Sequence, residues 1–261
     1  MRITTWNINS VRLRLGLLAR VIEETRADIV CLQEIKVQNV DFPAHDIATL
    51  GFPHQLVRGF KGYNGVAILS RTPIEEGDSR DWCGKVDGRH VVGVLPGGVA
   101  LHNFYVPAGG DVPDPEHNDK FAHKLRFLAE MTSWFAGQNS GKRILVGDLN
   151  IAPREADVWS HKQLLKVVSH TPVEVEHLDD LMDAQSWVDA VRHFIPDTEQ
   201  LYSWWSYRTR GWPGSDRGRR LDHIWVSPSL QSSLRGIDLL RDARGWEKPS
   251  DHIPVTVDIA I

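Results

Sequence analysis

Polar and ionisable side chains lie beside several short apolar runs of this chain. In open α/β proteins, the crevice at the carboxyl ends of strands is where ligands bind. Carboxylate and amide oxygens are the ligands that magnesium and manganese prefer, whereas zinc sites are richer in cysteine and histidine. Carboxylates, amides and a histidine at strand ends are the residue types that a metal-dependent phosphoesterase site needs. Its members are Asn7, Glu34, Asp148, Asn150, Asp251 and His252.

Each of these motifs also has a purely structural explanation. Asp148 and Asn150 follow an apolar run in a turn, where such residues are common for local reasons. The functional interpretation is an Asp that activates or positions water beside an Asn that holds a phosphate oxygen. Glu34 ends a buried strand and needs a partner, for which Lys36 is as good a candidate as a metal. Asn7 is explained equally well as a residue that closes a strand.

The case for His252 rests on a second acid. Asp222 lies in a strand pattern, and an acid that orients a histidine makes it an electrostatic clamp for a developing oxyanion. The adjacent His223 faces the other side of that strand and is interpreted as structural. Tyr105 also ends an apolar run and is either a packing residue or a phosphate contact, because the small residues after it leave backbone N–H groups accessible.

Aromatic residues and arginines alternate between residues 201 and 220. Core packing explains two or three of the rings, but arginines are not expected in a core, and the mixture suits contact with a nucleic-acid backbone and its bases. The net charge of −4 argues weakly against nucleic acid, yet residues 203–220 carry +4, which leaves −8 elsewhere. The candidate DNA-binding residues are Trp204, Arg208, Arg210, Trp212, Arg217 and Arg219.

Composition and length set the frame for these motifs. The 261 residues, 41% hydrophobic and 25% charged, suffice to build a core. Candidate residues lie near both ends without a low-complexity linker between them, so residues 1–261 are expected to form one domain. Prolines and glycines in the uncharged stretch 91–110 argue against a membrane helix, and no signal peptide is expected. The two cysteines fit a reducing cytoplasm.

Short β-branched runs predict strands, and two longer segments have the period of amphipathic helices. Several runs are apolar at consecutive positions, which indicates sheets buried on both faces. We therefore expect an α/β fold with two packed sheets flanked by helices. The predicted helices cover 11–26 and 121–135, with Leu125 in the apolar stripe of the second. The predicted strands are 3–8, 29–32, 66–69, 91–95, 99–106, 143–146, 221–227 and 255–259.

Seven segments, taken in order, closely resemble the exonuclease III family of DNA-repair nucleases, and the resemblance covers essentially the whole chain. Single motifs are shared with the wider endonuclease/exonuclease/phosphatase superfamily, but the Lys-Gly-Tyr-Asn-Gly-Val-Ala segment and the arginine-rich aromatic stretch favour the exonuclease III branch. The segments are Thr5-Trp6-Asn7-Ile8-Asn9-Ser10, Leu32-Gln33-Glu34, Lys61-Gly62-Tyr63-Asn64-Gly65-Val66-Ala67, Tyr105-Val106-Pro107, Gly147-Asp148-Leu149-Asn150, Gly218-Arg219-Arg220-Leu221-Asp222 and Ser250-Asp251-His252-Ile253-Pro254-Val255.

The resemblance implies a four-layer α/β sandwich with two mixed sheets. It also implies metal-dependent attack of water on a phosphodiester of double-stranded DNA, 5′ to an abasic site or at a 3′ end. Mg²⁺ is the implied cofactor, and Mn²⁺ could replace it. Glu34 would bind the metal. The implied neighbours or further ligands are Asn7, Asp148, Asn150 and Asp251.

The resemblance also assigns chemical roles. Asp148 would position or deprotonate the water, and Asn150 would hold the phosphate. His252, oriented by Asp222, would stabilise the pentacovalent transition state. Tyr105 would contact the phosphate or assist the leaving group, and the choice between Asp148 and Tyr105 as general base or acid stays open. Because one chain supplies the whole site, a monomer is the default expectation, without a membrane partner.

Two positions depart from the family pattern. Ala108 stands where several relatives carry an amide side chain that reaches toward DNA, so this contact passes to the backbone of Gly109 and Gly110 or is lost. Arg219 stands where some relatives place Trp or Leu in the pocket for the abasic sugar. An apolar wall excludes normal nucleotides better than a flexible cation, so this departure bears on the strength of abasic-site selectivity.

Two other functions compete with the repair nuclease. A superfamily phosphatase that acts on a lipid, inositol or nucleotide phosphate would not need the arginine-rich aromatic stretch. A DNA-binding or scaffold module without catalysis would have no reason to keep five costly polar groups together. The sequence therefore favours the nuclease. The five groups are Glu34, Asp148, Asn150, Asp222 and His252.

Overall fold

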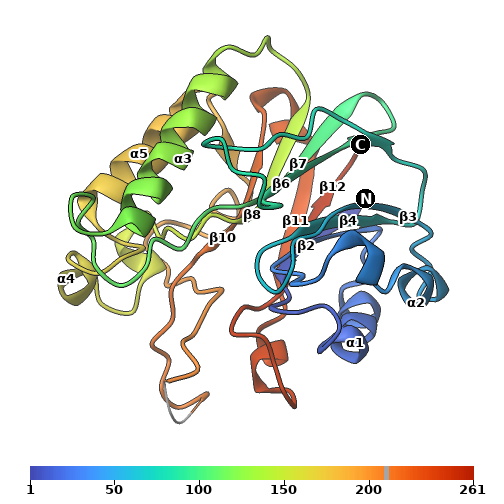
Figure 1. The fold of residues 1–261 in the computed structure, drawn as a ribbon, viewed down its shortest axis with the longest axis horizontal. Helices are drawn as coiled ribbons and strands as arrows, with labels where there is room; N and C mark the ends of the chain where they lie inside the picture. The colour runs from blue at the N-terminus through green and yellow to red at the C-terminus, as the bar shows by residue number, and fades with distance from the viewer. Residues whose placement is uncertain (209–211) are drawn as a thin grey trace.

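A computed structural model describes residues 1–208 and 212–261 of the chain, and these residues form two six-stranded sheets flanked by helices (Figure 1). The eight strands that the sequence predicts are all present. The strands are β1 (Arg2–Asn7), β2 (Ile29–Gln33), β3 (His54–Arg58), β4 (Val66–Ser70), β5 (Glu75–Glu76), β6 (His90–Leu95), β7 (Val99–Tyr105), β8 (Arg143–Asp148), β9 (Val188–Asp189), β10 (Asp222–Val226), β11 (Leu234–Leu239) and β12 (Val255–Ile259). The α-helices are α1 (Leu15–Thr25), α2 (Ala44–Thr49), α3 (Asp119–Ala136), α4 (His161–Leu164) and α5 (Pro172–Asp183).

The two sheets have the same mixed character. The first has the order β11-β12-β1-β2-β4-β3, and the second has the order β5-β6-β7-β8-β10-β9. Strands β1 and β2 run parallel in the first sheet, as β7 and β8 do in the second, and the other pairs are antiparallel. Each parallel pair is joined through a helix, α1 or α3, as a parallel connection requires.

Apolar side chains on the inner faces of both sheets form one shared core, which includes Ile3, Ile68, Leu101 and Ile224. A second cluster packs α1 against the outer face of the first sheet, and a third packs α3 and α5 against the outer face of the second. Figure 1 shows α3 and α5 side by side on one outer side, with α1 and α2 on the other. The fold is a four-layer α/β sandwich.

Both parallel pairs end at the same edge of the sandwich. Asn7 lies opposite Gln33 at the end of β1 and β2, one residue before Glu34. Tyr105 lies opposite Asp148 at the end of β7 and β8, and Asp222 at the start of β10 is also paired with Asp148. The sheet register therefore brings side chains from the two sheets to one edge.

Several elements escape the sequence patterns. Strands β3 and β11 carry half-buried residues without a clean alternation, and β11 contains a register shift next to Leu234. Helix α5 begins with a capping box, in which Thr171 accepts from the Glu174 backbone and Pro172 occupies the first turn. In α3 the buried stripe includes Lys124, whereas Leu125 is only half-buried. No helix among the described residues is long and apolar enough to cross a membrane.

Candidate active site

A cavity of about 460 Å³ opens at the edge where the strands of both sheets end. Its wall contains Glu34, directly after β2, and Tyr105 and Asp148, at the ends of β7 and β8. Asn150, Asp251 and His252 also line it. The structure thus brings together residues that are more than 200 positions apart in the sequence, because β1 and β12 are neighbours in the first sheet and the second sheet packs on it.

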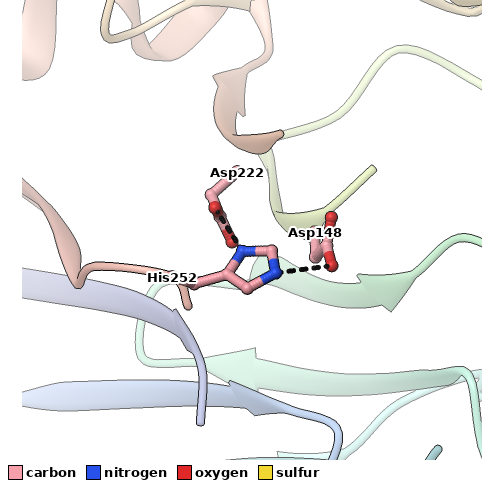
Figure 2. Close-up of side chains that lie close together, drawn as sticks. All are labelled: Asp148, Asp222 and His252. Atoms are coloured by element: carbon pink, nitrogen blue, oxygen red, sulfur yellow. Dashed lines mark hydrogen bonds and ion pairs between the residues drawn. The ribbon is translucent and has the colours of Figure 1, made fainter. Parts of the chain in front are cut away.

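His252 lies between two carboxylates (Figure 2). Its Nδ1 atom is 2.8 Å from Asp222 Oδ2, and its Nε2 atom is 3.6 Å from Asp148 Oδ2. The same Asp222 oxygen accepts a 2.6 Å hydrogen bond from Ser203 Oγ. Since Asp222 holds one ring nitrogen firmly, the other nitrogen points toward Asp148 across a distance too long for a hydrogen bond. A third acceptor could enter there.

The two carboxylates decide the charge of the imidazole. Burial disfavours the charged ring, but the charges of Asp222 and Asp148 outweigh this effect and raise the pKa of His252 to about 10. Burial raises the pKa of Asp148 to about 7, against the lowering effect of His252 and with a further contribution from Asp222. At neutral pH the site therefore contains a charged imidazole beside a carboxylate that can exchange a proton.

Glu34 is the centre of a second set of contacts. Its Oε1 atom accepts from Tyr105 Oη at 2.8 Å and from Asn7 Nδ2 at 3.0 Å, and its Oε2 atom lies 2.7 Å from Lys36 Nζ. The salt bridge to Lys36 is therefore formed, alongside the contacts inside the cavity. Burial opposes ionisation of Glu34, but Lys36 and the two donors lower its pKa. The carboxyl group is thus held as an anion.

One amide joins the two sets of contacts. Asn7 Nδ2 donates both to Glu34 Oε1 and to Asp148 Oδ2, the latter at 2.9 Å. Asp251 lies beside them and accepts from Asn9 Nδ2 and Trp204 Nε1, each at 3.0 Å. Burial would raise the pKa of Asp251, but the charge of His252 and these donors lower it. Neither donor to Asp251 carries a positive charge.

Asn150 adopts a left-handed backbone conformation, with φ of 55°. Its backbone N–H donates to Asp148 Oδ1 at 2.9 Å, and its Nδ2 donates to the Val106 carbonyl oxygen at 2.9 Å. Its own carbonyl oxygen accepts from Lys124 Nζ at 2.8 Å. Lys124 is fully buried and is paired with the equally buried Glu174. Lys124 and Glu174 thus fix the turn that presents Asn150.

Sequence reasoning missed this supporting pair. Lys124 lies three residues after Phe121 and four before Leu128, so it occupies the buried face of α3. A cation at that position of an apolar stripe is the signal that could have identified it, because a buried ammonium needs a partner. Ser203 and Asn9, which support Asp222 and Asp251, carry no comparable sequence signal.

The donor set fits a hard divalent cation. The carboxyl groups of Glu34, Asp148 and Asp251 line the cavity, where Lys36 pairs with the first and the charged His252 lies beside the second. Excess negative charge and oxygen donors suit magnesium or manganese. Among the described residues, Asp148, Asp222 and His252 form a group of potential ligands whose atoms lie within 4.8 Å of one another. Here His252 already acts as the counter-ion, which favours Glu34 and its neighbours for the metal.

The arginine-rich aromatic stretch divides between the cavity and the core. Trp204, Arg208 and Arg219 line the cavity. Arg210 lies outside the described residues. Trp205 is buried, and Trp212 packs against it with ring centroids 4.7 Å apart. Packing therefore explains at least these two rings.

The expectation that arginines avoid the core is wrong at one position. Arg220 is buried, because it forms ion pairs with Asp157 at 2.8 Å and Asp189 at 2.7 Å. Buried partners remove the cost that would otherwise exclude the guanidinium. Arg217 is exposed and stacks on Trp159, 4.8 Å from the ring centroid, outside the cavity wall.

The sequence pattern of the endonuclease/exonuclease/phosphatase family matches residues 4–252. Exodeoxyribonuclease III of Haemophilus influenzae is 30% identical to this chain over 272 residues, which cover 98% of each protein. An exodeoxyribonuclease of Bacillus subtilis is 29% identical over the full length of both.

Solved structures give the same picture. An AP endonuclease from Archaeoglobus fulgidus superposes with a TM-score of 0.90 at 29% identity, over all of both chains. A 3′ phosphatase from Neisseria, bound to a product DNA hairpin, also superposes with a TM-score of 0.90, at 31% identity and with full coverage.

Proposed function

The chain belongs to the exonuclease III family of DNA-repair nucleases, and from this premise we propose that it uses a divalent metal to hydrolyse the phosphodiester 5′ to abasic sites and to trim 3′ ends. The observation that carries the proposal is the charged imidazole of His252 between Asp222 and Asp148, in a cavity that it shares with Glu34 and Asn150. The substrate proposed is double-stranded DNA.

Glu34 would hold the metal, and its neighbours would complete the site. The fit rests on the oxygen donors of Glu34, Asp148 and Asp251, beside which Lys36 and His252 are the charged partners. We propose Mg²⁺, with Mn²⁺ as a substitute. When bound, the ion would neutralise negative charge on the phosphate oxygens. The neighbours are Asn7, Asp148, Asn150 and Asp251.

The chain's own groups would carry the proton transfers. Asp148 would accept a proton from the attacking water, because a carboxyl group whose pKa is close to 7 can act as a base at neutral pH. Burial and the charge of Glu34 raise the pKa of Tyr105 well above its ordinary value, so its phenol stays protonated. A protonated phenol cannot act as the base, so we propose Asp148 for that role and leave to Tyr105 the donation of a hydrogen bond to the leaving oxygen.

His252 and Asn150 would stabilise the transition state. The Nε2–H group of His252 is directed into the cavity, while Asp222 fixes the ring. A donor that is already oriented and charged stabilises an oxyanion without further reorganisation. Asn150 uses one amide hydrogen to hold Val106 and has a second to offer to a phosphate oxygen. The backbone near Gly109 and Gly110 remains our candidate for the contact that Ala108 cannot make.

The same observations support the remaining proposals. We propose that residues 1–261 form one domain, since Asn7 from one end of the chain donates to Asp148, and His252 from the other end lines the same cavity as Asp148. We also propose a monomer, because one chain supplies every group of the site. A reducing cytoplasm is proposed from two free cysteines, Cys31 and Cys83, of which Cys31 is buried.

Cleavage of a duplex with one abasic analogue tests the proposed function. The same reactions would include EDTA in place of Mg²⁺, an intact duplex and a small phosphomonoester. Asp148→Asn should bind the duplex as the unaltered protein does, yet lose turnover by about a hundredfold or more, because it removes the base of the chemical step. Equal loss of binding would contradict that role. Hydrolysis of the small ester alone would point to a superfamily phosphatase.

A further inference from the structure

One guanidinium in the cavity forms no ion pair with an acid among residues 1–208 and 212–261. Arg219 Nη1 donates to the Val168 carbonyl oxygen at 2.8 Å and to Ser169 Oγ at 2.7 Å, and both acceptors are neutral. Its Nε atom is buried without a hydrogen-bond partner among the described residues. Arg219 forms no salt bridge with any described residue. The adjacent Arg220 forms two, with Asp157 and Asp189. The charge of Glu174 acts on Arg219 only at a distance, without forming an ion pair with it in the described chain.

The position of this guanidinium is fixed. It lies over the ring of Trp204, 5.3 Å from the centroid. The Ser169 backbone N–H donates to both carboxylate oxygens of Glu174, each at 2.9 Å. Glu174 in turn pairs with Lys124, which holds the carbonyl of Asn150. A continuous series of buried contacts therefore connects the anchor of Arg219 to the turn that presents Asn150.

A fixed cation with unused donors favours an anionic ligand. Burial lowers the pKa of Arg219, and the charge of Glu174 offsets this effect only in part. A carboxylate or phosphate in the cavity would supply the missing charge, and the planar guanidinium can offer it paired donors. A neutral sugar could accept a hydrogen bond from the guanidinium, but it would supply no negative charge, which makes it the weaker ligand.

The reaction determines which part of the substrate would meet Arg219. Water adds its oxygen to phosphorus, the bond from phosphorus to the strand's O3′ breaks, and O3′ takes a proton. The substituent on phosphorus other than O3′ stays attached to the phosphate that leaves the strand. In a terminal 3′-phosphate this is an additional charged oxygen, in a 3′-phosphoglycolate it is a carboxylate, and at an abasic site it is a neutral deoxyribose.

We propose that Arg219 is a specificity-determining residue that makes the cavity select DNA 3′ ends with negative charge beyond that of a phosphodiester. This inference rests on the proposed function and names the preferred substrate class of the same site. The shared chemistry is an anionic group attached to the scissile phosphate, either an ionised phosphate oxygen or a carboxylate. Internal abasic sites are then the poorer substrates.

The experiment compares kcat/KM for four duplex substrates. They end in a 3′-phosphoglycolate, its neutral 3′-phosphoglycolamide analogue or a 3′-phosphate, or they contain an internal abasic analogue. The unaltered enzyme should prefer the glycolate to the amide by about tenfold or more, as a charged hydrogen bond predicts. Arg219→Leu should remove this preference, and Arg219→Lys should keep part of it.

Arg217→Leu is the matched control, because it removes an arginine two positions away that stacks on Trp159 outside the cavity wall. It should change all four substrates in parallel. Arg219→Gln provides a second neutral variant if the leucine variant does not fold. The two anionic ends separate the sources of charge, since loss of selectivity for the 3′-phosphate alone would identify the phosphate oxygen as the ligand.

A preference that survives in both neutral Arg219 variants would overturn the proposal. So would a parallel fall for all four substrates, which would make Arg219 a general DNA contact. If the unaltered enzyme cleaves none of the four, the proposed function fails together with the inference. The unaltered enzyme could also cleave the two anionic ends and the two neutral substrates with equal kcat/KM. That result would overturn only the role of Arg219.

Discussion

Histidines are charged in one region of this molecule and neutral in another, although they are buried in both. In the cavity, Asp222 and Asp148 flank His252 and raise its pKa to about 10. Beneath α3, His90 and His102 stack on each other among aromatic rings, with Nε2 of the first 3.2 Å from Nδ1 of the second. Burial is the largest influence there, and it lowers the pKa of His102 to about 3.

The difference shows that burial alone does not set the charge of a group. Asp222 and His223 repeat the contrast on neighbouring positions of β10. Asp222 faces His252, whereas His223 points to the other side and donates Nε2–H to the Ile151 carbonyl oxygen at 2.8 Å. Burial lowers the pKa of His223 to about 4. Carboxylates reach one face of the second sheet and aromatic rings the other, so each histidine takes the state that its neighbours stabilise.

The largest effect is expected when the charged histidine is removed. His252→Ala should lower kcat on the abasic duplex by about a hundredfold to a thousandfold, because it removes a preorganised donor to the transition state. Steady-state cleavage under saturating DNA and Mg²⁺ measures this. His102→Phe is the matched control from the aromatic layer, and its kcat should stay within about threefold of normal. A similar loss of kcat in both variants would show that the two regions do not differ in function.

A smaller loss is expected when the partner of His252 becomes neutral. Asp222→Asn keeps the size of the side chain and leaves an acceptor for Ser203, but it removes the charge that stabilises the imidazolium. We expect kcat to fall by about tenfold to a hundredfold while DNA affinity changes little. The free energy of unfolding should be measured beside it. Unchanged turnover in a folded variant would show that Asp148 alone keeps His252 charged.

The aromatic layer should make the protein sensitive to acid. The pKa of His102 is about 3 in the folded state against an ordinary value of 6.5, so below pH 6.5 the unfolded chain binds more protons. Stability therefore decreases as the pH falls, by about 1.5 kcal/mol for each such histidine between pH 6.5 and pH 5. Burial and the charge of its neighbour also lower the pKa of His90, which acts in the same direction.

Denaturant unfolding at pH 7.5, 6.5 and 5.0 measures this effect. His102→Phe should show the shallower decrease, whatever its stability at pH 7.5. The comparison of slopes cancels contributions common to both proteins, including that of Asp148, whose raised pKa acts in the opposite direction. If the free energy of unfolding falls with pH equally in both proteins, the pKa of His102 is not lowered by burial, and the contrast with His252 fails.

The sequence named most of the residues that meet at the cavity, but it did not name the residues that support them. Strand-end motifs identified the groups around His252, because strands of both sheets end at one edge and the side chains there are polar for chemical reasons. Lys124 and Ser203 were missed, since their roles depend on partners from distant segments. Arg220 was misassigned for the same reason, because its charge is acceptable only beside Asp157 and Asp189. Local sequence patterns therefore indicate the chemical type of a side chain, whereas its burial and its contacts depend on partners from distant segments.

The smallest effect is expected at the exposed rim of the cavity. Arg208 is exposed and lines the cavity opening, so a DNA phosphate there would pair with it in water rather than in the interior. Arg208→Gln should reduce the slope of log affinity against log salt concentration by about one, with little change in kcat. Arg235→Gln, an exposed arginine of β11 outside the cavity, should leave the slope unchanged. If both variants behave alike, Arg208 does not contact DNA. A loss confined to kcat would instead place Arg208 with His252, as a group that acts on the reacting phosphate.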